Sequence, residues 1–206
     1  MYKLTCFLAI LGCFVSLAVS AAPADKICAD ISRSQYSAPF SLASLKTRFL
    51  RAHNGIRHKY GVPEVKWDNG LARYAQEWAN YLKKNKQCNI QHRTGAMMKK
   101  RYGENLGFNW TSKRLAHGHF DGSPEKVTMS WAKECKDFSL DRGSCKSNAV
   151  CGHFTQVVWK DTKKIGCGVA VCEGQGHAEV WVCNYDPPGN VIKTDGTGKR
   201  LPLKPF

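Results

Sequence analysis

The sequence predicts an α/β/α sandwich, a single domain in which helices pack on both sides of a small antiparallel sheet. Three segments between residues 41 and 138 carry apolar residues at helical spacing. Two runs with the alternation of strands follow at 165–171 and 180–185. The length of the chain suits one domain with a substantial core, so helices and strands should share it.

The first 22 residues are typical of a secretory signal peptide. Lys3 precedes an apolar run from Leu4 to Val19, and Ser20-Ala21-Ala22 offers small residues for cleavage. This run is too short to span a membrane, and no later apolar run reaches about 18 residues. We therefore expect a secreted, extracellular chain that is not membrane-spanning.

The charge is strongly positive, and removal of Lys3 lowers it only from +15 to +14. Such an excess favours anionic partners, namely lipid head groups, sulfated glycans or acidic proteins, and a solvated basic surface is the alternative. We expect no nucleic acid partner for a secreted chain. The basic clusters are Lys99-Lys100-Arg101 and Lys160, Lys163 and Lys164.

Eight cysteines remain once Cys6 and Cys13 leave with the signal peptide. An even number in a secreted chain indicates four disulfides, for which sequence alone allows 105 pairings. A zinc–cysteine site is the alternative, although no C-x-x-C pair occurs. The eight are Cys28, Cys88, Cys135, Cys145, Cys151, Cys167, Cys172 and Cys183.

The two ends of the mature chain lack a sustained period. Residues 23–40 contain Pro23 and Pro39, which predicts an irregular N-terminal arm held by Cys28. Residues 191–206 are rich in Gly, Lys and Pro and form a C-terminal tail. The main domain is therefore expected over residues 41–190.

The first helix is expected from Ser41 or Ser44, either of which can cap its start, to a stop at Gly61 and Pro63. Its apolar stripe consists of Leu45, Phe49, Ala52, Ile56 and Tyr60.

Two further helices follow. Asp68 is expected to cap the second, which ends in a lysine cluster at 83–86, where cations suit the helix dipole. Ser123-Pro124 is expected to open the third. Glu134 shares an apolar face with Val127, Trp131 and Phe138, so its charge needs a partner, for which His153 or His92 is the candidate.

The segments between these elements are expected to be irregular. Residues 107–122 have the composition of a loop, and residues 139–150 form a polar loop between cysteines. Residues 173–177 are expected to connect the two strands as a hairpin.

Five motifs stand in a distinctive order and suggest a family. The longest places His153 at the mouth of an apolar run, where a polar group needs partners or water. The motifs are Gln91-His92, Tyr102-Gly-Glu104-Asn-Leu, Trp131-Ala-Lys-Glu134, Cys151-Gly-His-Phe-Thr-Gln-Val-Val-Trp159 and Cys183-Asn-Tyr-Asp-Pro-Pro-Gly-Asn190. In these the chain resembles the CAP superfamily (cysteine-rich secretory proteins, antigen 5 and plant pathogenesis-related class one proteins). It looks most like the venom-allergen-like proteins of parasitic worms.

This resemblance implies specific disulfides. Equivalents of Cys88 and Cys172 and of Cys167 and Cys183 are joined in family members, and a Cys145–Cys151 loop is closed as in the plant proteins. Cys28 and Cys135 then remain for the fourth bond. The family's His-Asn-x-x-Arg pattern, here His53, Asn54 and Arg57, usually serves structural hydrogen bonds.

The resemblance also implies a cleft lined by His92, Glu104, Glu134 and His153. Two imidazoles, His92 and His153, supply two ligands, so zinc or magnesium would need water or a carboxylate as well. A His/Glu network without metal is the alternative. Arg93 replaces the family's small hydroxyl residue and brings a fixed cation, which disfavours a dication.

Lipid binding is the function that the resemblance implies, with sterols and fatty acids as ligands and with export or sequestration from a host as the role. A secreted module that binds anionic glycans or host proteins is the alternative. We expect no enzyme, since neither H-E-x-x-H nor a nucleophile elbow occurs, although the tetrad leaves a metal-dependent hydrolase as a further alternative. The sequon at Asn109 predicts glycosylation. The lipid channel candidates are Leu45, Phe49, Ala52, Ile56, Val127, Trp131 and Phe138.

Overall fold

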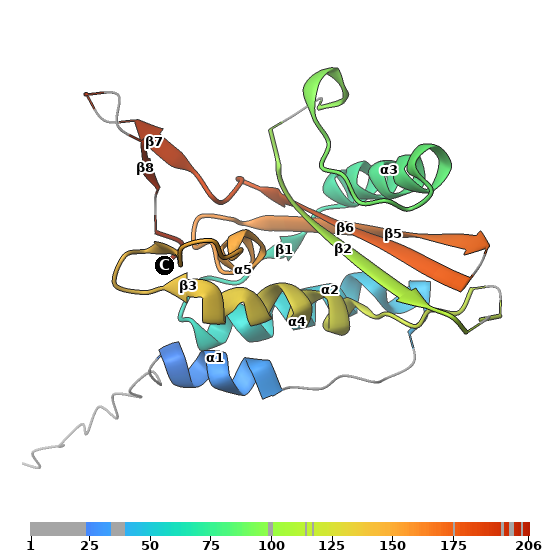
Figure 1. Ribbon diagram of the computed structural model, residues 1–206, viewed down its shortest axis with the longest axis horizontal. Helices are drawn as coiled ribbons and strands as arrows, with labels where there is room; N and C mark the ends of the chain where they lie inside the picture. Colours follow the sequence, from blue (N-terminus) through green and yellow to red (C-terminus); the bar gives the residue numbers. More distant parts are fainter. Residues whose placement is uncertain are drawn as a thin grey trace, which may run out of the picture.

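The computed structural model has three layers, in which helices cover both faces of a central sheet (Figure 1). This confirms the predicted α/β/α sandwich. The structure describes residues 24–33, 40–98, 101–113, 115–116, 118–174, 176–194, 196–197, 200–202 and 204–206. The predicted signal peptide, together with Lys99 and Lys100, lies outside the described residues.

The helices are α1 (Ala24–Arg33), α2 (Leu45–Lys59), α3 (Asn69–Lys86), α4 (Pro124–Ala132) and α5 (Gly152–Val157). Short 3-10 helices are η1 (Leu42–Ser44), η2 (Gly95–Met97) and η3 (Lys133–Asp137). The strands are β1 (Lys66–Trp67), β2 (Gly103–Thr111), β3 (Phe138–Ser139), β4 (Ser144–Cys145), β5 (Lys164–Gly174), β6 (Gly176–Asp186), β7 (Ile192–Thr194) and β8 (Arg200–Pro202).

The central sheet has the order β1-β5-β6-β2, and β2 is one of its edges. The β5–β6 and β6–β2 pairs are antiparallel, whereas the short β1 pairs with β5 in parallel. Pairing of β5 and β6 continues to Gly174 opposite Gly176. The hairpin connection is therefore shorter than the predicted 173–177.

Helix α3 lies against one face of the sheet, across β5 and β6 (Figure 1). The glycine at 168 permits this close approach, because a Cβ there would stand 2.6 Å from the Cα of Gln76. Beneath α3 the apolar side chains form a core of Ala75, Trp78, Ala79, Leu82, Leu106, Val180 and Val182.

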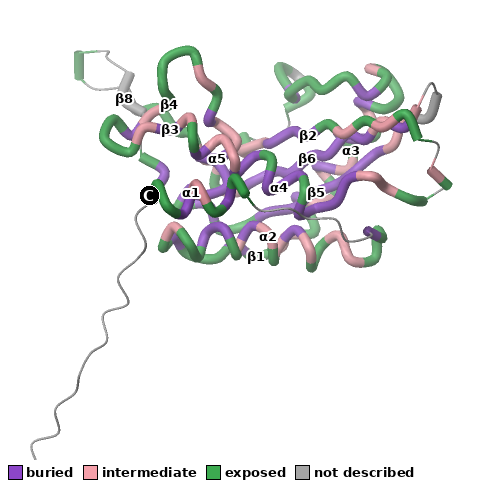
Figure 2. Tube along the Cα trace, turned by 60° about the horizontal axis from the view of Figure 1, so that its bottom comes forward, coloured by how far each residue is buried: buried purple, intermediate pink, exposed green. Residues whose placement is uncertain are grey.

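The opposite face is covered by α2, α4 and α5, with α1 outside them (Figures 1 and 2). Ile27 and Ile31 of α1 are buried against this core, at 8% and 0% exposure. The prediction of an irregular arm is thus wrong for residues 24–33. The two isoleucines stand four residues apart. This is a helical spacing, but the segment is too short for the period to be recognised over a window of about 11–18 residues.

Helix starts agree with the sequence in two of three cases. Asp68 accepts a hydrogen bond from Leu71 N at 2.9 Å, and Ser123 accepts one from Lys126 N at 3.2 Å. Neither Ser41 nor Ser44 caps α2 through its side chain, because η1 precedes that helix directly.

Two other local predictions are wrong. The third helix does not run to Phe138, since α4 ends at Ala132 and η3 follows. Residues 107–111 are not loop but the second half of β2. Leu106 is buried on the α3 face. Phe108 and Trp110 follow it at every second residue and share that face, so the period of two was present in the sequence.

The His-Asn-x-x-Arg residues make structural hydrogen bonds. Arg57 is fully buried and donates to four carbonyl oxygens, among them those of Val157 and Trp159 at 2.8 and 2.9 Å. Asn54 exchanges two hydrogen bonds with the backbone of Val65. These contacts fix α2 to the segments around α5 and β1.

The C-terminal residues pack on the domain rather than away from it. Phe206 contacts the rings of Tyr60, Phe138 and Phe154, and Pro205 O accepts from Lys160 N at 2.8 Å. No helix in the described part of the chain combines the length and the hydropathy that a bilayer crossing requires.

The four disulfides tie these layers together. Cys28–Cys135 joins α1 to η3, and Cys145–Cys151 closes the loop before α5. Cys88–Cys172 joins the segment directly after α3 to β5, and Cys167–Cys183 joins β5 to β6. These are the pairs that the resemblance implies.

Candidate functional site: two histidine–glutamate pairs and an adjacent pocket

The first pair lies where the loop after α3 meets the start of β2. His92 donates from Nδ1 to Oε1 of Glu104 at 2.9 Å, and the same oxygen accepts from Arg93 N at 3.1 Å. The His92 side chain is 56% exposed and that of Glu104 only 10%, so the carboxylate is held in place and the imidazole faces solvent.

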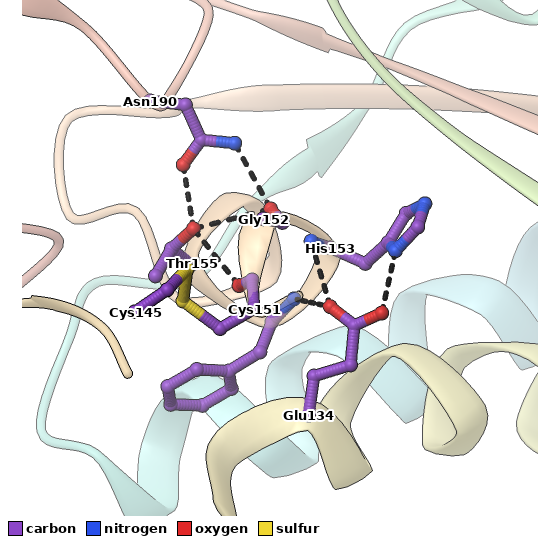
Figure 3. Close-up of a disulfide and its surroundings, with 8 residues drawn as sticks. Glu134, Cys145, Cys151, Gly152, His153, Thr155 and Asn190 are labelled. Atoms are coloured by element: carbon purple, nitrogen blue, oxygen red, sulfur yellow. Dashed lines mark hydrogen bonds and ion pairs between the residues drawn. A yellow bond between two sulfur atoms is a disulfide. The ribbon is translucent and has the colours of Figure 1, made fainter. Parts of the chain in front are cut away.

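The second pair joins η3 to α5 (Figure 3). His153 donates to Glu134 both from Nδ1 at 2.7 Å and from its backbone N at 3.0 Å. The other ring nitrogen of His153 points away from Glu134 in Figure 3. A carboxylate at the first turn of a helix also interacts favourably with the helix dipole. Of the two partners considered for Glu134, the structure therefore selects His153.

Asn105 links the second pair to the core. Its Nδ2 donates to His153 O at 3.1 Å and to the Tyr185 hydroxyl at 3.2 Å. Glu104 and Asn105 are neighbours in β2 and therefore project to opposite faces of that strand. The four side chains expected to share one cleft form two pairs, His92 with Glu104 and His153 with Glu134.

A metal centre needs more ligands than these pairs provide. Among the described residues, no group of three or more His, Cys, Asp and Glu side chains is placed to hold a metal ion. Catalytic zinc usually takes three protein ligands. Carboxylates on Nδ1 do orient the imidazoles of His92 and His153 as they would around a metal, but the residues present do not fit a closed metal site.

Arg93 packs against α3 beside the first pair. Its guanidinium lies 3.6 Å from the centroid of the Tyr74 ring and donates to Tyr74 O at 2.6 Å. The cation therefore stacks on an aromatic ring, which the sequence did not indicate. A hollow of about 210 Å³ opens here, lined by Tyr74, His92, Arg93, Met98, Tyr102, Glu104 and Asn184.

A larger pocket of about 320 Å³ lies between α2 and α4. We call it the α2–α4 pocket, and it is lined by Arg48, Arg51, Ala52, Gly55, Ile56, Lys59, Glu125 and Met129. Ala52 and Ile56 were among the channel candidates. The sequence missed Gly55 and Met129, although small residues at 52 and 55 on one side of α2 were a usable signal.

The remaining channel candidates do not line this pocket. Phe49, Val127, Trp131 and Phe138 are 7% exposed or less and belong to the core, and Leu45 packs against it. Their apolar spacing therefore reflects packing in the core and not the lining of this pocket.

A buried carboxylate organises the rim of the α2–α4 pocket. Glu125 is 5% exposed and pairs with Arg48 at 2.7 Å and with Arg51 at 3.0 Å. Burial opposes its ionisation, but the hydrogen bonds from Arg48 and Arg51 outweigh this and hold the pKa of Glu125 below its ordinary value. Glu125 is therefore an anion beside two cationic side chains.

The predicted glycosylation residue, Asn109, lies half-buried in β2. Its Nδ2, the atom that would carry a glycan, donates to Oδ2 of Asp121 at 3.1 Å. This bond, against a smaller opposing effect of burial, holds the pKa of Asp121 below its ordinary value.

Comparisons with known proteins agree with this architecture. Residues 50–185 match the model of the cysteine-rich secretory protein family, CAP. The chain belongs to the CAP family. It is 40% identical over 144 residues to pathogenesis-related protein 1B of Nicotiana tabacum, a match that covers 70% of this chain and 76% of that one.

Solved structures of CAP relatives share the fold. The structure of BmVAL-1 has a TM-score of 0.52 at 26% identity and covers 82% of this chain and 80% of its own. Venom allergen-like protein 4 of Schistosoma mansoni has a TM-score of 0.51 at 21% identity, covering 71% and 90%, which supports the fold alone. Four disulfides fit an extracellular protein of this family.

Proposed function

We propose that this CAP protein is secreted and binds lipid without catalysis, with a fatty acid held in the α2–α4 pocket. The pocket is the observation that carries the proposal. Its volume of about 320 Å³ falls within the range of small-molecule sites, roughly 300–1,000 Å³.

The chemistry of the pocket suits an amphiphile with an acidic head. Ala52, Ile56 and Met129 provide apolar contacts, and each buried methylene contributes about 0.8 kcal/mol. Lys59 is exposed at the rim, where it can meet a carboxylate, whereas Arg51 already pairs with Glu125. Arg48 is engaged with Glu125 and serves the structure of the rim instead.

The proposal is tested by what the protein carries and by filling the pocket. Organic extraction of protein secreted by eukaryotic cells, followed by mass spectrometry, should release fatty acid. A Cβ on Gly55 meets nothing within 4 Å, so Gly55→Leu has room at its Cβ and should fill the pocket, weakening binding of a fluorescent fatty acid by about tenfold.

Gly55→Ala is the matched control, since it gives the same gain in helix propensity, about 1 kcal/mol, while leaving the pocket open. Equal affinity in the two variants, or wild-type protein with neither extractable nor competable fatty acid, would refute the proposal.

A second apolar cavity, of about 290 Å³, favours sterol as a further ligand. It adjoins the Cys145–Cys151 disulfide, with Phe138 and Trp159 in its wall and Ile192 at its rim. Ile192 is 45% exposed, so Ile192→Asp should reduce sterol competition without unfolding the chain. Gly55→Leu should leave sterol binding unchanged, and a loss there instead would assign sterol to the α2–α4 pocket.

Binding to anionic glycans or host proteins is the second candidate. Lys160, Lys163 and Lys164 are exposed, although Lys164 lies 3.5 Å from Asp68. Retention on heparin that disappears with salt would support this candidate, and retention unaffected by moderate salt would oppose it.

We propose the absence of catalysis because the cysteine side chains are not available as nucleophiles. All eight cysteines of the described chain are in disulfides, which removes thiol nucleophiles. Hydrolysis that is lost in the Glu104→Gln plus Glu134→Gln variant would contradict it.

A further inference from the structure

One end of the molecule brings together three segments that are distant in sequence. The C-terminal end of α3, the β5–β6 hairpin and the end of β2 lie at the right-hand side of Figure 1. The strand register places Cys172, Ala178 and Trp110 side by side in one row of the sheet. The Cys88–Cys172 disulfide fastens the end of α3 to that row.

Large apolar side chains are exposed at this end. Phe108 and Trp110 are 51% and 57% exposed, and Ile90, two residues after Cys88, is 49% exposed. Phe108 and Trp110 project from the face of the sheet that α3 covers, but α3 lies across β5 and β6 and leaves these two residues of the edge strand β2 exposed. The indole of Trp110 lies over Gly176 of the hairpin.

Cations stand beside these side chains. Lys83, Lys84 and Lys86 occupy the last turn of α3, and the carbonyl oxygen of Lys83 lies 4.0 Å from Cys172 Sγ. Two strand spacings, roughly 10 Å, separate Cys172 from Trp110. Neither residues 78–103 nor residues 105–120 contain Asp or Glu.

We propose that this hairpin-end surface, made of Lys83, Lys84, Lys86, Ile90, Phe108 and Trp110, docks on a membrane with anionic headgroups. Indole and phenyl rings are stabilised at the boundary between headgroups and acyl chains. Lysines extend their charged ends to the phosphates while their stems cover apolar surface. The surface needs no segment that spans the bilayer.

Charge decides between a membrane and a second copy of the chain. An exposed edge strand can pair with another β2, but that arrangement would bring two lysine clusters of the same sign toward each other. An anionic surface meets the same lysines with opposite charge. Docking is also independent of the α2–α4 pocket, because none of the six residues lines it.

The test is sedimentation of the purified full chain with vesicles. We expect binding to phosphatidylserine–phosphatidylcholine vesicles and none to vesicles of phosphatidylcholine alone. Lys83→Gln plus Lys84→Gln should weaken binding by about fivefold per lysine. Lys160→Gln plus Lys163→Gln removes the same charge from another exposed segment and should leave binding unchanged.

The aromatic contribution has its own controls. Phe108→Ser plus Trp110→Ser should weaken binding at least about tenfold. Val150→Ser plus Leu140→Ser, at residues that are exposed elsewhere, should not. Brominated lipid should quench the tryptophan fluorescence of the wild type. It should quench that of Trp110→Phe much less, since four of the other tryptophans are 3% exposed or less. Circular dichroism confirms that each variant is folded.

Three results would overturn the proposal: equal binding to both vesicle types, equal loss in the two lysine variants, or a dimer in sedimentation velocity that disappears in the Phe108→Ser plus Trp110→Ser variant. Fatty acid extraction is unaffected by each of them, so docking and the proposed function fail separately.

Discussion

His53 accepts a hydrogen bond at Nε2 from the hydroxyl of Tyr185, 2.9 Å away, in the centre of the core. The direction follows from the other ring nitrogen, because Nδ1 lies 2.9 Å from Phe49 O, which can only accept. Burial lowers the pKa of His53 to about 4 and raises that of Tyr185, so both groups stay neutral. The contact therefore joins two uncharged side chains.

This neutral histidine predicts a loss of stability in mild acid. Its pKa is below the unfolded value of 6.5, so the unfolded state takes up the proton first as the pH falls. The contribution, up to about 3 kcal/mol, is complete above pH 6.5 and is lost as the pH falls to about 4. Chemical denaturation across this range should show that the free energy of unfolding decreases as the pH falls, and His53→Gln should reduce this dependence. His58→Gln, exposed on the same helix, should retain it.

Removal of the Glu134 carboxylate should destabilise the start of α5. Glu134→Ala leaves the Nδ1 and backbone N of His153 without their acceptor, which costs about 1–3 kcal/mol. Glu134→Gln retains one acceptor oxygen and should lose less. Urea denaturation measures the difference, and Glu64→Ala, at an exposed residue, serves as control. A loss no greater than that of the control would contradict the assigned role.

Fatty acid affinity should follow the charge at the rim of the α2–α4 pocket. Lys59→Gln removes an exposed cation and should weaken binding about two- to fivefold, as for one partly solvated ion pair. Lys46→Gln is the control, because Lys46 is exposed on α2 but does not line the pocket. Displacement of a fluorescent fatty acid compares them. If both variants lose affinity equally, the rim does not hold the carboxylate.

The disulfides should differ in what their removal costs. Cys28–Cys135 spans 107 residues and Cys145–Cys151 spans six, which corresponds to about 5 and about 2 kcal/mol in the chain-entropy model. Paired Cys→Ser variants measured by guanidinium denaturation should preserve this order. The reverse order would mean that contacts in the short loop outweigh chain entropy.

Chelation should have little effect on stability. The two imidazoles of His92 and His153 are held by separate carboxylates, and no larger group of ligands adjoins them in the described part of the chain. We expect Tm to change by less than about 2 °C on addition of EDTA, because a weakly bound ion contributes little to folding. A large fall in Tm would reveal a tight metal site.

Local signals in the sequence were reliable where one segment decides the structure. The caps at Asp68 and Ser123 depend on residues three positions away, and both form. Glu134 on an apolar face needed a partner, and it has one in His153. The family motifs supplied the disulfide pairs, which spacing alone leaves open.

Contacts between distant segments were not predictable in the same way. Arg48 and Glu125 are 77 residues apart, and nothing in either segment specifies the other. Glu179 is wholly buried in β6 and accepts from the backbone N of Asp121 and Gly122 at 2.7 and 2.9 Å. A single acid directly before the β-rich run at 180–185 was the only sign of this anchor.

The order of Glu104 and Asn105 in β2 makes the His92–Glu104 pair and the contact of Asn105 with the His153 carbonyl depend on one strand register. A slip by a single residue would turn the Glu104 carboxylate into the packed interior and move Asn105 out to the side of His92. Insertions in the preceding loop are therefore tolerable only if they end before Gly103, whereas one extra residue between Gly103 and Asn105 would separate Glu104 from His92 or Asn105 from the carbonyl oxygen of His153.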